Sequence, residues 1–131
     1  MRNLVTLQKK AVRIADGAKF KDHTSPIFAR FRALKLIDLV NYSISVVMYR
    51  VSVNDVPPKI AHMFISNQRI HNYNTRKIND LHIQFARTNV RSHTLRLEGI
   101  KVWNEFPLSI RSITSLHTFK RMVKKLLLEK Y

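Results

Sequence analysis

The scarcity of glycine and proline constrains the fold of this chain more than any local motif does. The 131 residues include only two glycines and four prolines, and these residues form most of the tight turns that join β-strands. A many-stranded fold is therefore disfavoured and a helical one is favoured. Because hydrophobic residues make up 45% of the sequence, a chain of this length can bury a core. We expect one compact, mostly α domain over residues 1–131.

Apolar residues recur at three- and four-residue steps along much of the chain, which is typical of amphipathic helices. In the first segment Leu4, Leu7 and Ile14 share one face, and Gly17 supplies a stop. For the strongly apolar segment 36–53, length favours a helix over a strand. The long predicted helices cover about residues 3–15, 36–53 and 97–106, with a long basic C-terminal helix after Thr114-Ser115, and shorter helical segments follow Thr24 and span Ile60–Phe64.

One segment has the two-residue period of a β-strand. From Leu81 to Phe85 apolar and polar residues alternate, as in a half-buried strand. Residues 94–97 are expected to pair back on it, giving one small β-hairpin at about residues 81–97. The preceding stretch 66–79 is polar and lacks periodicity, so we predict a surface loop there.

Positive charge dominates the chain, because 24 Lys and Arg stand against 8 Asp and Glu, a formal net charge of +16. Such a field attracts polyanions, and nucleic-acid backbones are the partner class it suits. Basic residues gather in the polar middle of the chain, which includes Arg69, and on the C-terminal helix. The candidate contacts to RNA or DNA phosphates are Arg76, Lys77, Arg87, Arg91, Arg96, Lys101, Lys120, Arg121, Lys124 and Lys125.

Two aromatic residues invite a functional interpretation. Tyr73 lies near Arg76 in the polar stretch, where a ring can stack on an unpaired base. We favour packing of this ring against the loop. Trp103, the lone tryptophan, lies at helical spacing with Ile100 and Phe106, so we interpret it as a core residue.

Recognisable catalytic, cofactor and metal motifs are missing from the sequence. There is no cysteine, no adjacent pair of aspartates, no glycine-rich phosphate loop, and no HExxH spacing among six histidines. We therefore predict no enzyme activity, cofactor, metal or small-molecule substrate. The N-terminal residues lack the features of a signal peptide, and no stretch approaches about 20 apolar residues. An intracellular protein of the nucleus or cytoplasm, away from membranes, is expected.

Several short segments resemble one family in their order and spacing. The segment LQKKAVRI at 7–14 is similar to an LQxxAxRI pattern, and GIKVWNEFP at 99–107 to a GPKxWNxLP pattern. These patterns occur downstream of the polymerase core in non-LTR (LINE-type) retrotransposon reverse transcriptases. The other matching segments are HTSPIF at 23–28, LKL at 34–36, MYR at 48–50, VPP at 56–58, HNYNTR at 71–76, RTN at 87–89 and SLHTFK at 115–120.

The resemblance implies a C-terminal accessory region without the polymerase palm and its metal-binding aspartates. The parent protein would be an RNA-directed DNA polymerase, and this region would help to hold the RNA template or the target DNA. The sequence departs from the family pattern at three places. Ile100 stands where the pattern usually has proline, and Phe106 stands where leucine is frequent. Arg32-Ala33 occupies the positions before Leu36 where the family usually has an LGIL-like segment.

Two alternatives to nucleic-acid binding stay open. The domain could dock on a polymerase core as a structural module, with its charge serving solubility alone. The departures from the family pattern also fit a non-functional relic of a mobile element. An enzyme in its own right would need a metal or nucleophile constellation, which the sequence does not contain.

Overall fold

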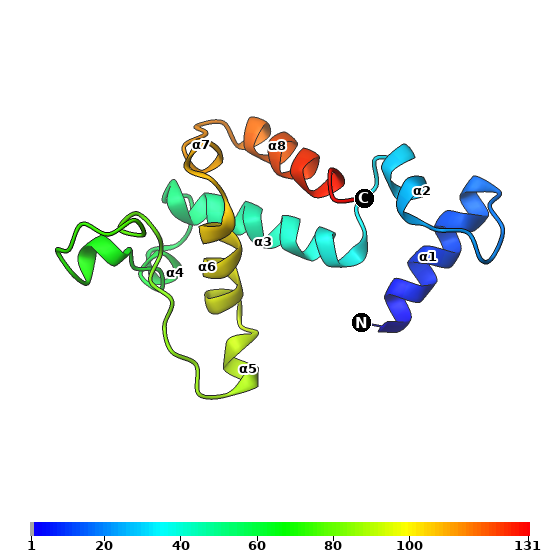
Figure 1. Ribbon diagram of the computed structural model, residues 1–131. Coiled ribbons are helices and arrows are strands. Elements are labelled where there is room, and N and C mark those ends of the chain that lie inside the picture. The colour runs from blue at the N-terminus through cyan, green and yellow to red at the C-terminus, as the bar shows by residue number, and fades with distance from the viewer. Residues whose placement is uncertain (1) are drawn as a thin grey trace. The chain divides into compact units, whose positions relative to one another are not determined.

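The computed structural model describes residues 2–131, and over this range the protein is mostly helical (Figure 1). The mostly α prediction is confirmed. Among the described residues, no helix is long and apolar enough to cross a membrane. The helices are α1 (Arg2–Asp16), α2 (Ser25–Arg30), α3 (Leu36–Ser52), α4 (Pro58–Ala61), the 3₁₀ helix η1 (Asn67–Arg69), α5 (Asn89–Ser92), α6 (Leu95–Glu105), α7 (Leu108–Arg111) and α8 (Leu116–Leu128).

The helices group into two compact units. The first unit contains the residues up to Tyr42 together with Lys120–Tyr131, and the second contains Ser43–Phe119. The long helices α3 and α8 each supply residues to both units. The organisation of residues 1–131 as one domain stays a prediction.

The helices α1, α2 and α3 are each followed, within two residues, by a residue in the left-handed backbone region. These residues are Gly17, Arg32 and Asn54, with φ of 70°, 48° and 58°. Backbone N–H groups just beyond each helix then donate to its last free carbonyls, as from Ala18 to Arg13 at 3.0 Å. Glycine adopts this conformation without steric cost, and asparagine tolerates it better than arginine does. The predicted stop at Asp16-Gly17 is confirmed.

An aromatic cluster forms the core of the second unit. Phe119, the fourth residue of α8, is fully buried, and its ring stacks on that of Tyr49 with centroids 4.6 Å apart. The rings of Trp103 and Phe106 lie 6.0 and 6.1 Å from it. The Tyr49 hydroxyl donates a 2.6 Å hydrogen bond to the carbonyl of Thr114. Within this unit α3, α6 and the start of α8 are thus held by aromatic packing, and the interpretation of Trp103 as a core residue is confirmed.

The helices α3 and α6 approach closely inside the second unit because a glycine lies at their contact (Figure 1). A Cβ added to Gly99 would lie 2.7 Å from the sulfur of Met48, which is itself fully buried. Any larger residue would have to displace the Met48 side chain in a packed interior. This explains a glycine in the interior of a helix, where it otherwise costs about 1 kcal/mol relative to alanine.

The predicted β-hairpin at residues 81–97 is wrong. No strand is present in the part of the chain that the structure describes, apart from an isolated antiparallel bridge between Ser66 and Leu81. The backbone N–H and C=O of Leu81 instead bond the side-chain amide of Asn104, each at 2.9 Å. The amide of Asn104 thus makes the hydrogen bonds that a partner strand would have made. A local sequence pattern cannot predict this long-range contact.

The residues expected to form the second strand of the hairpin begin α6. Thr94 stands at the N-cap, and Leu97, Ile100 and Trp103 are buried at three-residue steps. A helical period that buries large side chains is worth several kcal/mol. The short alternation at residues 94–97 cannot match that gain, so the helix forms.

The last residue of the chain joins three segments of the first unit. The hydroxyl of Tyr131 donates to the carboxylate of Asp38 at 2.8 Å and accepts from the backbone N–H of Lys35 at 2.7 Å. Its ring packs edge-on against Phe28, with centroids 6.2 Å apart, and the Lys35 ammonium lies 4.1 Å from its centre. Burial raises the pKa of Tyr131 to about 12, and the nearby Asp38 carboxylate adds to the rise.

Tyr131 therefore makes stability depend on pH in the alkaline range. A phenol whose pKa is higher in the folded state stabilises that state fully below its unfolded pKa of about 10. This contribution is lost as the pH rises through about 12. We expect Tyr131→Phe to flatten the fall in the free energy of unfolding over this interval, as measured by urea denaturation. Equal pH dependence in both proteins would contradict the assignment.

Candidate nucleic-acid interface

The helix α8 separates apolar and basic residues onto different sides. Leucine and valine recur at helical spacing, so that Val123 and Leu127 are buried. Arg121, Lys124 and Lys125 are exposed. The long basic C-terminal helix predicted from the sequence is confirmed as a helix, and three of its four candidate cations lie on its solvent side.

A second segment of the same unit brings a fourth cation to these three. Arg32 follows α2, and together with the C-terminal half of α8 this segment forms an open groove of about 590 Å³. Four of its seven lining residues are cationic and one is acidic. The groove is lined by Ala29, Arg32, Arg121, Lys124, Lys125, Leu128 and Glu129. We call this feature the α8 groove.

The cations of the α8 groove are poorly neutralised by the protein. Among residues 2–131, the only ion pair that involves them joins the Lys125 ammonium to Glu129 at 4.0 Å. Both side chains are more than half exposed, so this pair contributes little. Arg32, Arg121 and Lys124 make no ion pair within this range. Neighbouring like charges repel one another, and a bound anion would relieve this repulsion. Arginine and lysine are also the residue types that most often contact phosphate oxygens.

Arg32 was not among the candidates from the sequence. Its position is fixed by backbone hydrogen bonds at the end of α2. Its N–H donates to the carbonyl of Ala29, and the N–H of Ala33 donates to that of Phe28, both at 3.0 Å. This is the helix ending in which glycine is usual. A left-handed arginine costs on the order of 1–2 kcal/mol. Backbone strain of this kind is often found at functional sites. No local sequence pattern predicts the left-handed backbone of Arg32.

Arg32→Gly is therefore expected to separate stability from binding. Glycine relieves the backbone strain while adding entropy to the unfolded chain, and we expect the free energy of unfolding to rise by about 0.5 kcal/mol. Anion affinity should fall because a groove cation is lost. Arg32→Gln, which keeps the strain and loses the charge, should weaken binding without the gain in stability. Denaturant titrations and binding measurements on both variants test this, and a less stable Arg32→Gly protein would refute it.

Two candidates from the middle of the chain lie in surroundings of mixed charge. Lys77 and Lys101 line a second-unit cavity of about 490 Å³ that also contains Asp80 and Glu105. The ammonium of Lys101 lies 3.4 Å from the carboxylate of Glu98. This cavity does not concentrate positive charge as the α8 groove does.

The remaining sequence candidates are not among the residues that line the α8 groove. Arg76, Arg87 and Arg91 are exposed, and each comes from the second unit. The Nε–H of Arg96 donates to the carbonyl of Met63 at 3.1 Å. Lys120 is half-buried and does not line the groove. Their role in binding stays a prediction.

Tyr73 is placed differently from the sequence interpretation. Its side chain is 78% exposed, so packing of the ring against the loop is wrong. The only aromatic neighbour among the described residues is His71, whose ring centre lies 6.1 Å away. Neither the charges nor the turn residues near Tyr73 in the sequence predict whether its ring is exposed or packed against the loop.

Comparisons of the chain with models of protein families, with curated proteins and with solved structures find no match. Among residues 2–131, no three His, Asp or Glu side chains are placed to hold a metal ion together.

Proposed function

We propose that the protein is a non-catalytic, nucleic-acid-binding helical domain that holds a sugar–phosphate backbone along the α8 groove. The observation that carries this proposal is the convergence of Arg32 with three cations of α8 around a single carboxylate. Arginine forks suit phosphate oxygens in pairs, and lysine supplies mobile point charges. Contacts from these cations to phosphates carry no sequence information, so the binding proposed here is independent of sequence.

The charge of the whole chain supports the same proposal. A formal +16 raises the local concentration of a polyanion and accelerates its association. Each phosphate that the protein neutralises releases condensed counterions, which favours binding at low salt. Solubility alone does not require three cations for every anion.

The segments that resemble non-LTR reverse transcriptases give this proposal a biological setting. On that reading the chain derives from an RNA-directed DNA polymerase of a transposable element, as an accessory region that helps to hold the RNA template or the target DNA. It would then work inside the cell, in the nucleus or cytoplasm. The proposal of phosphate binding does not depend on this origin.

A filter-binding titration with single-stranded RNA and DNA tests the proposed function. If four phosphates are neutralised, the affinity for single strands should fall on the order of fiftyfold between 50 and 200 mM salt, because the logarithmic slope is roughly −0.7 per contact. Added contacts elsewhere would steepen this slope. Binding that does not respond to salt, or no binding to either polymer, would overturn the proposal.

A second candidate function is docking on a polymerase core, and the exposed apolar stripe of α1 favours it. No described residue of this helix is buried, and Leu4, Leu7 and Ile14 are 58%, 58% and 81% exposed. Such a stripe is typical of a surface that a partner covers. Unchanged nucleic-acid affinity after neutralising the α8 cations, in a protein that still folds, would favour docking over phosphate binding.

A further inference from the structure

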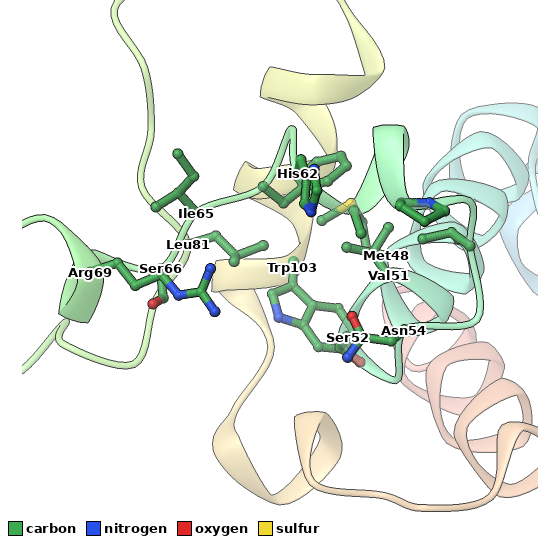
Figure 2. Close-up of a pocket in the computed structure, with 14 residues that line it drawn as sticks. Met48, Val51, Ser52, Asn54, His62, Ile65, Ser66, Arg69, Leu81 and Trp103 are labelled. Carbon is green, nitrogen blue, oxygen red and sulfur yellow. The ribbon is translucent and has the colours of Figure 1, made fainter.

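The second unit contains a cavity whose chemistry differs from that of the α8 groove. It is open to solvent and measures about 940 Å³, within the range of pockets that hold small organic ligands. Its walls come from the end of α3, the segment around α4, the η1 segment and α6 (Figure 2). All these residues belong to the same compact unit.

The interior wall of this cavity is apolar and partly aromatic. Met48, Val51 and Trp103 form one part of it, and Ile65 and Leu81 form another (Figure 2). These side chains are in contact with the folded core, where Trp103 is 5% exposed. Because Met48, Val51 and Trp103 are already buried, a flat ring that enters the cavity would cover mainly the half-buried side chains of Ile65 and Leu81.

Three polar side chains that line the cavity make no hydrogen bond within the described residues, whereas the hydroxyl of Ser52, which also lines it, donates to the carbonyl of Tyr49. The three are those of Asn54, His62 and Ser66. Figure 2 shows these amide, imidazole and hydroxyl groups on different sides of the cavity, and together they can both donate and accept. Such groups match the mixed donors and acceptors of a base better than they match an aliphatic side chain.

One charged residue lines the cavity, and it is cationic. Figure 2 shows Arg69 extending from η1 with its guanidinium turned toward Trp103. This guanidinium makes no ion pair within the described residues, and no Asp or Glu lines the cavity. A cation at the opening of an apolar, partly aromatic cavity suits a ligand that joins a flat ring to a phosphate.

We infer that this cavity binds an unpaired nucleobase, with Arg69 on the adjoining phosphate. The inference rests on the proposed function, since a single-stranded nucleic acid would supply the base. Recognition of single strands by splayed bases is a common mode for RNA and single-stranded DNA. Because a base is free to enter a cavity only when it is unpaired, this contact favours single strands over duplexes.

Trp103 supplies a direct probe of this inference. It is the only tryptophan in the chain, so a change in tryptophan emission on titration reports on a wall of the cavity. We expect each of the four ribonucleoside 5′-monophosphates to quench this emission saturably. Ribose 5-phosphate, which has the phosphate but no base, should not quench it.

Two matched variants separate the role of Arg69 from that of general charge. Arg69→Gln should raise the midpoint of the nucleotide titration about tenfold. Lys59→Gln removes the same charge from an exposed residue nearby in sequence that does not line the cavity, and it should leave the midpoint unchanged. Equal effects of the two variants would overturn the assignment of Arg69.

The outcome also distinguishes this inference from the proposed function. If single-stranded RNA binds with strong salt dependence but no nucleotide quenches Trp103, the base cavity is wrong and the phosphate groove stands. Quenching by ribose 5-phosphate equal to that by nucleotides would likewise overturn the base cavity. If neither polynucleotide nor nucleotide binds, both proposals fail.

Discussion

Replacing Arg32, Arg121, Lys124 and Lys125 with glutamine is expected to weaken the binding of single-stranded RNA and DNA on the order of a hundredfold at about 0.1 M salt. The four side chains line one groove, so their substitution removes the local contacts as well as four units of charge. The salt dependence should fall at the same time, by roughly 0.7 in logarithmic slope for each lost contact. Filter binding over a salt series measures both quantities.

A variant with the same charge change outside the groove provides the control. Lys9, Lys10, Lys19 and Lys21 are exposed residues that do not line the α8 groove. Their replacement with glutamine lowers the net charge by the same four units. We expect a much smaller loss of affinity, because only the long-range field changes. Equal losses in the two variants would mean that net charge, and not the groove, determines binding.

Phe119→Ala is expected to cost about 3–5 kcal/mol in the free energy of unfolding. The ring is fully buried and contacts three other aromatic rings, so its removal leaves a cavity that rigid neighbours cannot fill. Stability of small domains is typically 5–15 kcal/mol. The variant should therefore be close to unfolding, which urea denaturation followed by Trp103 fluorescence would show.

Phe85→Ala is the matched control, because Phe85 is 85% exposed. The same atoms are removed, but no cavity forms, and the expected change is within about 0.5 kcal/mol. A loss in this variant as large as that in Phe119→Ala would contradict the burial that the structure assigns to the two rings.

The long helices could be predicted from the sequence because their apolar residues follow a helical period, whether or not the structure buries them. α1, α3 and α8 repeat apolar residues at three- and four-residue steps over several turns, and Gly17 marks the end of the first. The segment from Leu81 was harder. Its alternation was real, but the strand-like backbone is satisfied by the side chain of Asn104, a contact over 23 residues that no local pattern encodes.

The candidate site could be predicted only in part. The cations of α8 follow from helical periodicity, so Arg121, Lys124 and Lys125 were found. Arg32 reaches the same groove through a tertiary contact, after a helix ending whose left-handed backbone is visible only in the structure. Similarly, nothing in the sequence distinguishes Arg69 from the other cations, whereas the structure shows that it lines the same cavity as Trp103.

The most direct measurement is a lysine footprint of the intact chain, with and without single-stranded RNA. Brief acetylation followed by mass spectrometry reports which ammonium groups the polymer covers. The account predicts protection of Lys124 and Lys125 in the α8 groove, with Lys21 and Lys59 labelled equally in both samples. Uniform protection of all lysines, or protection of Lys21 and Lys59 but not of the groove pair, would contradict the claim that a phosphate backbone lies along α8.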